Sequence, residues 1–485
     1  MATISATGCV MMWFRRDLRL ADNPALRAAV QTGRPLILLF VDDRDRKLGT
    51  SPGAAADWWL EGSLRRLGQD IAARGGQLSL HRGDPAVLLP QLAGSLAVDE
   101  VFWNRSGEPA IDARDRLIAT QLRQAGIMPR VFHATTLVDP DQLKTGSGQP
   151  YKVFSAFWRS ALRTLAPNAA LPAPVSLTSA SSPSGGENLT RWALRPTAPD
   201  WASGFAAEWE PGEAGAHRRL NEFLDAALDE YAEGRDRPDR AGTSRLSPHL
   251  GFGEISPRQV WHAVHDRLVA GAAIKPAEKF LAELGWRDFA YYLLHHFTDL
   301  RSENFNRAFD HFPWRSDPDG LAAWKRGQTG LPLVDAGMRQ LWETGWMHNR
   351  VRMVCASFLV KHLGCHWREG MEWFEHTLVD ADRAVNAASW QWVAGSGADA
   401  APYFRIFNPV RQGETFDPKG VYIRRWVPEL ARLSSPAVHA PWKGRRPSGY
   451  PEPVVGLEAG RDSAMAAYHI MRSASAVDSQ AEART

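Results

Sequence analysis

The first 135 residues alternate short apolar runs with longer stretches of helical periodicity, and this alternation constrains the fold more than any other feature of the chain. The apolar runs are CVMMWF, PLILLFVDD, QLSLHRG, EVFWNR and PRVFHA. Helical stretches such as AADWWLEGSLRRLGQDIAARG and PAIDARDRLIATQLRQAG lie between them. This order predicts a parallel, doubly wound α/β sheet over residues 1–135. Because no G-x-G-x-x-G follows the first run, we expect a domain that is Rossmann-like in outline only.

The rest of the chain has a different period. A segment rich in Ser, Pro, Ala and Gly, ALPAPVSLTSASSPSGGENL, predicts a linker or long surface loop within residues 136–205. From 206 to 473 apolar residues recur every 3.6 residues, as in AEKFLAELGWRDFAYYLLHHF, which predicts an all-helical second domain. Residues 474–485 are expected to form a short flexible tail. A chain of 485 residues is long enough for two such domains.

Composition narrows the classes of function. The three cysteines, Cys9, Cys355 and Cys365, provide neither a disulfide framework nor a four-cysteine iron–sulfur site. The 20 tryptophans favour a planar ligand, because indoles stack on bases, flavins and pterins. A net charge of +3 permits nucleic acid as a partner without requiring it. With neither a signal peptide nor a membrane-spanning run in the sequence, we expect a cytoplasmic monomer.

Residues 242–257, GTSRLSPHLGFGEISP, gather hydroxyls, backbone N–H groups and a guanidinium between two predicted helices. A helix start of this composition can hold a phosphate or pyrophosphate. A capped helix with a solvated loop is the alternative, and for this motif taken alone it is preferred.

Two helical stretches place polar and aromatic side chains on one face at the spacing i, i+3, i+4. They contain Glu283, Trp286 and Arg287 in FLAELGWRDF, and Asn349, Arg352 and Met353 in HNRVRM. Each set alone is explained by a salt bridge and core filling. Two such faces in one domain predict a ligand pocket of mixed polar and aromatic character.

The stretch DADRAVNAASWQW, residues 380–392, holds two indoles within three positions. If it is helical, Asp382, Asn386 and Trp390 share one face at four-residue intervals. Trp392 then lies about 200° from Trp390, at ~100° per residue. The two indoles are therefore expected to contact different partners.

Two further groups are weaker candidates. His362, Cys365 and His366 have metal-like spacing, but with no fourth ligand in view we expect them on the surface of an amphipathic helix, and no metal site is predicted. Glu108 in WNRSGEP follows a predicted strand end, where open parallel sheets bind ligands. An ordinary loop acid is the alternative for Glu108.

Four longer motifs carry a resemblance to a known family. WFRRDLRLADNPAL, GTSRLSPHLGFGEISP, GWMHNRVRMVCASFLVK and WQWVAGSGADAAPYFRIFNP closely resemble the photolyase/cryptochrome family, and the similarity runs from about residue 9 to 470. The chain looks most like a bacterial cyclobutane pyrimidine dimer photolyase, a deoxyribodipyrimidine photo-lyase. The resemblance implies an N-terminal α/β domain with an antenna chromophore and a C-terminal helical domain that binds FAD.

The resemblance also implies roles for single residues. Those implied to hold the FAD phosphates and ribityl chain are Tyr231, Thr243, Ser244, Arg245, Leu246 and Ser247. Arg287 and Asn349 are implied to line the flavin cavity. Arg352 is implied to pair with Asp380, and Asp382 to approach the ring system. Asn386 is implied to face flavin N5.

The implied reaction is light-driven electron transfer from reduced FAD to a flipped-out dimer in ultraviolet-damaged DNA. The residues implied to receive the dimer are Glu283, Trp286, Asn349, Met353 and Trp392. Glu283 would also stabilise the radical anion. Trp390, Trp367 and Trp314 would form an electron-hopping chain to the surface.

The antenna chromophore is expected to be methenyltetrahydrofolate, held by Glu108 and by stacking on Trp158, with deazaflavin as the alternative. WNRSGEP lacks the aromatic residue that often precedes the Glu in folate-binding members. Three other functions stay open. A cryptochrome is disfavoured by Asn386 and the short tail, and a (6-4) photolyase by Asn349 and Met353, where that class has a His pair. The third is a non-enzymatic helical nucleic-acid-binding protein.

Overall fold

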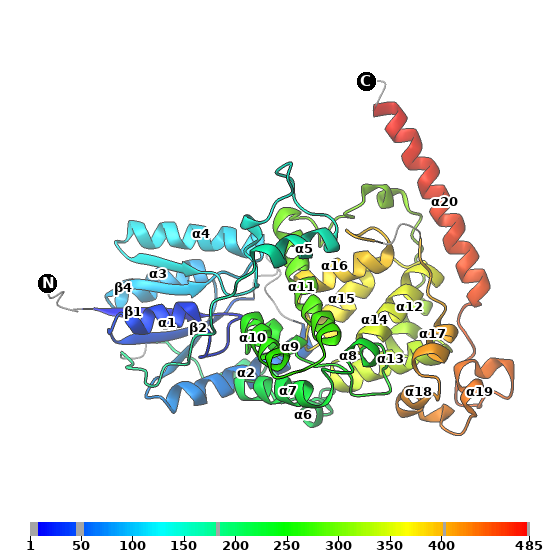
Figure 1. Cartoon of the computed structure of the whole chain (residues 1–485), viewed down its shortest axis with the longest axis horizontal. Coiled ribbons are helices and arrows are strands. Elements are labelled where there is room, and N and C mark those ends of the chain that lie inside the picture. Colours follow the sequence, from blue (N-terminus) through cyan, green and yellow to red (C-terminus); the bar gives the residue numbers. More distant parts are fainter. Residues whose placement is uncertain (1–7, 45–52, 181–184, 401–403, 483–485) are drawn as a thin grey trace.

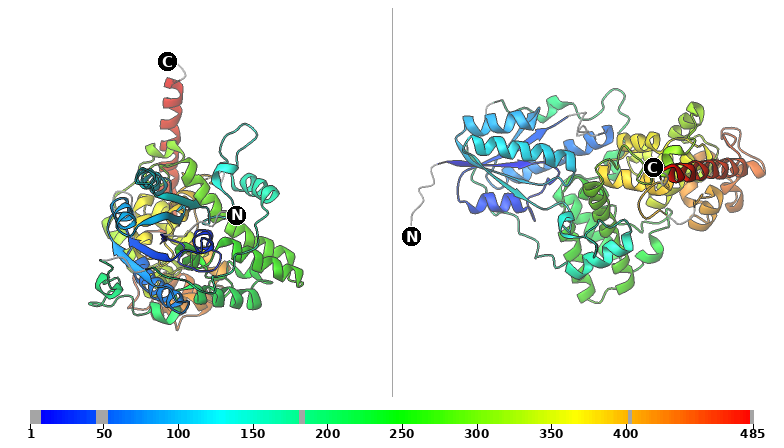
Figure 2. Two further views of the ribbon diagram at one scale, coloured as in Figure 1. Left: turned by 90° about the vertical axis from the view of Figure 1, so that its left-hand side faces the viewer. Right: turned by 90° about the horizontal axis from the view of Figure 1, so that it is seen from above.

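The computed structural model describes residues 8–44, 53–180, 185–400 and 404–482. An α/β domain lies beside a larger helical domain (Figures 1 and 2). This arrangement agrees with the predicted order of a doubly wound domain followed by a helical one.

The α/β domain contains the predicted parallel sheet. Its strands are β1 (Cys9–Phe14), β2 (Leu36–Asp42), β3 (Leu78–Arg82), β4 (Val98–Asn104) and β5 (Met128–Phe132). Its helices are α1 (Pro24–Gln31), α2 (Ala54–Ala72), α3 (Pro85–Ser95) and α4 (Pro109–Gln124). The strand order is β3-β2-β1-β4-β5, so all five predicted strands are confirmed. The order reverses between β1 and β4, where the carboxyl ends of the strands open a crevice.

Residues 136–205 are more structured than a linker. They contain η1 (Pro140–Gln142), α5 (Phe154–Thr164) and η2 (Leu189–Trp192), and Leu36 of β2 forms a parallel bridge with Ser179. Phe157 of α5 is buried, with its ring 5.1 Å from that of Phe289 in the helical domain. The expectation of a linker is therefore wrong for α5, because its apolar face completes the core of the second domain.

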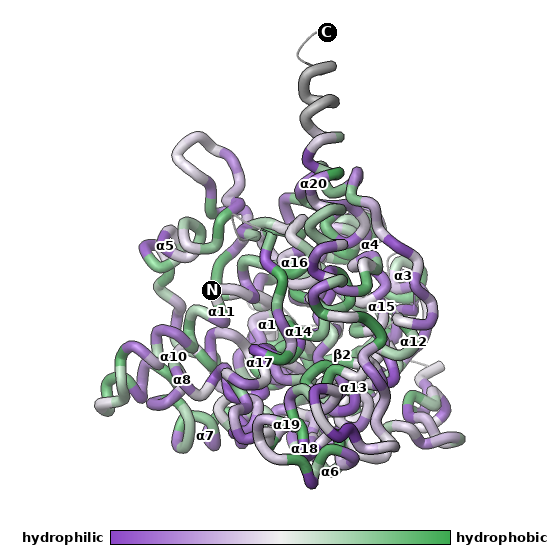
Figure 3. The backbone as a smooth tube through the Cα atoms, turned by 90° about the vertical axis from the view of Figure 1, so that its right-hand side faces the viewer, coloured by the Kyte–Doolittle hydropathy of each residue, from purple (hydrophilic) through white to green (hydrophobic). Residues whose placement is uncertain are grey.

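A long series of helices follows the segment of residues 136–205. Its first elements are α6 (Phe205–Glu208), α7 (Glu213–Ala226), α8 (Tyr231–Gly234), α9 (Ser247–Phe252), α10 (Pro257–Val269), α11 (Ile274–His296), η3 (Arg307–His311), α12 (Pro318–Arg326) and α13 (Pro332–Thr344). The others are α14 (Asn349–Ser357), η4 (Phe358–His362), α15 (Trp367–Thr377), α16 (Arg383–Ala394), α17 (Pro409–Phe416), α18 (Val421–Trp426), η5 (Pro428–Leu430), α19 (Ser435–His439), η6 (Pro441–Lys443) and α20 (Leu457–Glu482). Hydrophilic and hydrophobic residues alternate along these helices, as amphipathic packing requires (Figure 3).

The C-terminus differs from the expected flexible tail. Helix α20 runs to Glu482 and its end projects away from the body of the molecule (Figure 1). The sequence SASAVDSQAE continues a helix that is already formed, and Ala, Gln and Glu are good helix formers. The boundary predicted at 473 is therefore wrong for residues 474–482, and 483–485 lie outside the described residues.

The His362, Cys365 and His366 group is also placed differently from the prediction. His362 and Cys365 are buried rather than on a helix surface, because α20 packs over this turn at Gly460. Burial lowers the pKa of His362 to about 4. In the part of the chain that the structure describes, no group of three or more His, Cys, Asp or Glu side chains is placed to hold a metal ion.

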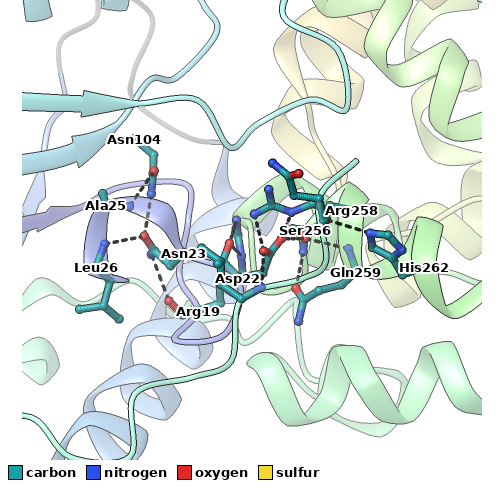
Figure 4. Close-up of polar contacts among 12 residues, drawn as sticks. Arg19, Asp22, Asn23, Ala25, Leu26, Asn104, Ser256, Arg258, Gln259 and His262 are labelled. Carbon is teal, nitrogen blue, oxygen red and sulfur yellow. Dashed lines mark hydrogen bonds and ion pairs between the residues drawn. The ribbon is translucent and has the colours of Figure 1, made fainter. Parts of the chain in front are cut away.

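The two domains are joined by a buried polar junction (Figure 4). The Asp22 carboxylate, after β1, accepts hydrogen bonds from the Ser256 hydroxyl, from Arg258 Nε at 3.0 Å and from the Leu171 amide at 2.9 Å. The buried Arg19 guanidinium donates to the carbonyls of Asp22 and Gly253, both at 2.8 Å. The loop after β1 is therefore fixed against the helical domain. Among the described helices, none combines the length and apolar character needed to cross a membrane.

Candidate functional site

Asp380 brings together two of the predicted motifs. Its Oδ2 accepts hydrogen bonds from the Ser247 hydroxyl at 2.6 Å and from Arg352 Nη2 at 2.8 Å. Ser247 begins α9, directly after the loop of residues 242–246, and Arg352 lies on α14. The side chain of Asp380 is 2% exposed, and within the described residues its Oδ1 has no hydrogen-bond partner. A buried carboxylate oxygen of this kind is available for a donor from a bound molecule.

The loop of residues 242–246 is held in an unusual conformation. Arg245 has φ of +51°, and its guanidinium lies 4.3 Å from the ring centre of Trp209 and 4.9 Å from that of Trp346. It also pairs with Glu208 at 3.0 Å. Burial lowers the pKa of Arg245, and its Nε has no partner among the described residues. The loop therefore presents a partly desolvated cation beside its hydroxyl groups.

The short helix that contains Tyr231 lies against the same loop. Tyr231 is buried in α8, and a side chain at Gly242 would collide with the backbone of Gly234, the last residue of that helix. The α8 helix and the loop with Thr243 and Ser244 are thus in backbone contact, which brings Tyr231 into the same part of the domain.

Helix α16 begins at a charged cap. The Asp382 carboxylate accepts hydrogen bonds from the backbone amides of Ala384 and Val385, which caps the helix. Its Oδ2 accepts a hydrogen bond from the Tyr291 hydroxyl of α11 at 2.9 Å and lies 4.0 Å from Arg287 Nε. One turn into the helix, Asn386 Nδ2 donates to the Met371 carbonyl at 3.0 Å. Sequence reasoning missed Tyr291, although it lies one turn after Arg287 on the same face.

The Glu283 face of α11 has two partners that sequence reasoning missed. Glu283 forms an ion pair with Arg235, the residue after α8. The ring of Trp286 stacks on that of Phe154 at 3.7 Å and 11°. Phe154 lies in the segment expected to be a linker, and Arg235 is 48 residues from Glu283, so no local spacing links either pair.

The remaining residues expected at the lesion pocket are partly accessible. Asn349 begins α14 and is exposed, and Met353 is half-buried on the same face. Trp392 is half-buried, and its Nε1 donates to the Asp399 carbonyl at 3.0 Å. Asn349 and Met353 therefore share the accessible part of α14 with Arg352, the partner of Asp380.

Of the three tryptophans expected to carry electrons, Trp367 begins α15, Trp390 lies on α16 and Trp314 precedes α12. A side chain at Gly370 would collide with the Trp390 ring, so Trp390 packs against α15 one turn from Trp367. Trp367 is fully buried, and Trp314 is half-buried. The His366 ring lies between them, 5.5 Å from the Trp367 ring and 4.8 Å from the Trp314 ring.

A second site lies in the crevice at the carboxyl ends of β1, β2 and β4. A cavity of about 1080 Å³, including the part open to solvent, is lined by residues of both domains. Seven arginines and four acids are among the described lining residues, and Glu108 there pairs with Arg383 of α16 at 3.0 Å. Trp158 is not among the described lining residues; it packs on α11 at Gly285. The structure therefore separates the two residues expected to bind the antenna chromophore.

Comparison with known proteins shows which family the chain resembles. A family model described as the FAD binding domain of DNA photolyase matches residues 280–470, and one described as DNA photolyase matches residues 10–175. A deoxyribodipyrimidine photo-lyase of Agrobacterium fabrum is 47% identical, with 95% of this chain and 98% of that protein covered. Cryptochrome-1 of Arabidopsis thaliana is 36% identical over 93% of this chain and 69% of its own length.

Solved structures agree with the sequence comparisons. The crystal structure of a bacterial class III photolyase from Agrobacterium tumefaciens matches with a TM-score of 0.93 at 45% identity, covering 97% of this chain and all of the other. A cryptochrome of Synechocystis matches with a TM-score of 0.86 at 28% identity, covering 96% and 99%. Both domains and the helices around Asp380 are thus accounted for by one family, and the chain belongs to the photolyase/cryptochrome family.

Proposed function

We propose that the protein is a light-dependent lyase that splits cyclobutane pyrimidine dimers in ultraviolet-damaged DNA. The supporting observation is the arrangement of α14, where Arg352 pairs with the buried Asp380 while Asn349 and Met353 stay accessible. These two residues stand where (6-4) photolyases, by the resemblance, have a His pair. The 47% identity to a deoxyribodipyrimidine photo-lyase favours the same reaction.

The residues around Asp380 fit FAD as the cofactor. Buried Asp380 Oδ1 and Arg245 Nε lack partners among the described residues, and a bound molecule with a donor and an acceptor would satisfy both. The hydroxyl groups of the adjoining loop suit phosphates. The residues that we assign to FAD are Tyr231, Thr243, Ser244, Arg245, Leu246, Ser247, Arg287, Asn349, Arg352, Asp380, Asp382 and Asn386.

In the proposed reaction the helical domain receives and orients the lesion. Trp286 and Trp392 offer indole faces to the flipped dinucleotide, and flipping is cheaper for a lesion that already stacks poorly. Glu283 and Asn349 contact its polar edge. Reduced FAD, when bound, supplies the electron that opens the cyclobutane ring and accepts it again afterwards. Fixed polar groups beside the dimer stabilise its negative charge during the time that it holds the electron.

The three tryptophans around α15 and α16 have a separate role in this proposal. Trp390, Trp367 and Trp314 would pass electrons from the surface inward, so that the cofactor can be reduced by light. An indole can lose an electron at moderate potential, whereas an aliphatic side chain cannot. The close packing of Trp390 on α15 supports this order.

For the antenna chromophore we propose methenyltetrahydrofolate, with deazaflavin as the other outcome of the test. The arginine-rich cavity that contains Glu108 suits an anionic planar molecule, whereas Trp158 would act from a separate position on α5. The absorption spectrum of the chromophores released on denaturation separates the two, because a folate and a deazaflavin absorb at different wavelengths.

The reaction is tested by lesion choice. Oligonucleotides that contain either a cyclobutane dimer or a (6-4) photoproduct are exposed to blue light with the reduced protein and then separated by chromatography. We expect loss of the cyclobutane dimer alone. Repair of (6-4) photoproducts alone would contradict the proposal, and repair of neither would favour a cryptochrome, for which the 36% identity to Cryptochrome-1 is the specific support.

We further propose a cytoplasmic monomer that draws DNA into a basic groove.

A further inference from the structure

The indole N–H of Trp367 begins a short chain of hydrogen bonds that ends at the protein surface. Its Nε1 donates to Asn304 Oδ1 at 2.9 Å, and Asn304 Nδ2 donates to Asp310 Oδ1 at 2.8 Å. Trp367 is fully buried and Asn304 is 4% exposed, whereas Asp310 is exposed and pairs with Arg307 Nε at 3.0 Å. The chain therefore joins a water-excluded indole to a solvated carboxylate.

The direction of these hydrogen bonds is fixed by the groups at the two ends. An indole N–H can only donate a hydrogen bond, and an ionised carboxylate can only accept one. The amide of Asn304 must therefore turn its oxygen toward Trp367 and its NH2 group toward Asp310. The negative charge beside the NH2 group polarises the amide, so the oxygen that faces the indole becomes a stronger acceptor.

Helix α16 holds Asn304 in this position. The buried side chain of Gln391 follows Trp390 in that helix. It accepts a hydrogen bond from the Phe305 amide and donates one to the Glu303 carbonyl, both at 2.8 Å. The backbone on each side of Asn304 is thus bonded to the helix that contains Trp390.

The surroundings of the N–H group differ among the tryptophans expected to carry electrons. The Nε1 atom of Trp314 is buried and has no hydrogen-bond partner among the described residues. Trp367 has the Asn304 oxygen at its N–H, and the Arg368 guanidinium lies 5.4 Å from its ring centre. An indole that loses an electron becomes a cation, which an acceptor oxygen stabilises and a nearby guanidinium destabilises. Asn304 therefore opposes the repulsion by Arg368.

We propose that Asn304 is a positioning residue for light-driven reduction of the protein: its amide oxygen, polarised by Asp310, stabilises the radical cation of Trp367 and so favours electron transfer from Trp367 to oxidised Trp390. In this step Trp390 regains one electron and Trp367 loses one. The proton stays on Trp367 Nε1, because an amide oxygen is a weak base. This role rests on the proposed electron-hopping function of the tryptophans. The alternative is a purely structural role, in which Asn304 only satisfies buried polar groups.

Transient absorption distinguishes the two roles. The full-length protein with oxidised FAD bound is excited by a blue pulse, and the amount of long-lived tryptophan radical per absorbed photon is measured. Asn304→Leu removes both hydrogen bonds and should lower this yield several-fold, because charge recombines before Trp367 is oxidised. Asp310→Asn removes only the charge, so a smaller loss is expected. Asn221→Leu, at an exposed position of α7, is the matched control and should leave the yield unchanged.

An isosteric exchange makes the result specific. The double variant Asn304→Asp, Asp310→Asn can keep both hydrogen bonds and places the negative charge directly at the Trp367 N–H. Its yield should equal or exceed that of the unchanged protein. The radical spectrum should shift toward the deprotonated indole, since a carboxylate is a better base than an amide and takes up the proton.

Two results would overturn the proposal. One is an unchanged yield in Asn304→Leu. The other is a loss in the exchange variant as large as that in Asn304→Leu, which would show a structural role. If Asn304→Leu does not fold, the two isosteric variants decide: a lower yield in Asp310→Asn that the exchange restores supports the proposal, and any other pattern overturns it.

Dimer splitting by protein already reduced with dithionite separates this role from the repair reaction. It should be the same in all these variants, because the repair electron does not pass through Trp367. If the unchanged protein splits dimers but forms no tryptophan radical, the electron-hopping function is wrong and the role of Asn304 falls with it. A normal radical yield without dimer splitting would contradict the repair reaction and leave the role of Asn304 intact.

Discussion

The two sides of α16 contain the same residue type in different surroundings. Trp390 is 2% exposed, and its nearest rings belong to Phe374 at 5.0 Å and Trp324 at 6.2 Å. Trp392, two residues later, is half-buried, and its N–H is anchored to the Asp399 carbonyl at 3.0 Å. The first indole is enclosed by other side chains, whereas the second is fixed at one edge and partly open to solvent.

This difference shows that the environment, rather than the residue type, separates the two proposed roles. A water-excluded indole in an aromatic shell suits electron transfer, because little solvent must reorganise when its charge changes. An anchored, accessible indole suits stacking on a ligand, because its ring is already ordered before binding. A substitution on one side of α16 should therefore alter the role of that side and leave the role of the other side unchanged.

The largest effect is expected for Trp390→Phe. Light-driven reduction of oxidised FAD should fall at least about tenfold, the loss that corresponds to ~1.4 kcal/mol of additional barrier, because phenylalanine is far harder to oxidise. Absorbance under steady illumination measures this rate. Repair by protein already reduced with dithionite should survive. Loss of that repair as well would mean that the two sides of α16 do not act separately.

Gly370→Ala should disturb the Trp390 side by packing alone. The added methyl group would lie 2.1 Å from the Trp390 ring and 2.7 Å from Leu359, and overpacking a core costs about 1–3 kcal/mol. Thermal unfolding and the rate of photoreduction should both show the change, while affinity for damaged DNA stays the same. Gly94→Ala is the matched control, because nothing lies within 4 Å of an added methyl group on the exposed side of α3. It should be neutral or slightly stabilising.

Trp392→Ala should have the reverse pattern. Binding of an oligonucleotide with a cyclobutane dimer should weaken by about 1–3 kcal/mol, the usual contribution of one base–aromatic stack. The rate of photoreduction should persist, since Trp392 is outside the aromatic shell of Trp390. A dark binding titration and steady illumination of the same preparation measure the two quantities, and equal loss of both would contradict the comparison.

The smallest effect concerns His366, whose ring lies between those of Trp314 and Trp367. Burial lowers its pKa to about 4, so the folded protein keeps this histidine neutral at a pH where an ordinary histidine, of pKa ~6.5, is charged. Photoreduction should therefore change little between pH 8 and pH 5.5 and decline only as the pH approaches 4. A midpoint near pH 6.5 in a pH profile of the rate would show that His366 is solvated and that this part of the chain is more open than Trp390.

Local patterns predicted much of this architecture. The strands were visible because both faces of a parallel sheet are buried, which produces continuous apolar runs such as LILLFVD. The separation of Trp390 from Trp392 followed from helix geometry, since a residue's angular position depends only on its place in the helix.

Contacts between distant segments could not be predicted in this way. The pairing of Glu283 with Arg235 and the stacking of Trp286 on Phe154 depend on how α8 and α5 pack against α11. The burial of His362 depends on a helix that starts almost 100 residues later, so amphipathicity in its own segment indicated a surface. In both cases the partners and the burial of these side chains depend on tertiary packing, which local periodicity does not determine.

The Asp22 junction has a consequence for how the molecule unfolds. Asp22 and Arg19 are buried with partners supplied from across the domain boundary, so separating the domains would strand a desolvated carboxylate without Arg258. Breaking a buried ion pair costs about 3–5 kcal/mol, a large part of a typical folding free energy. The two domains are therefore expected to unfold in a single cooperative transition. The α/β domain expressed alone should be less stable than it is in the full-length protein. Two domains that are distinct in the ribbon drawing are thus expected to behave as one thermodynamic unit.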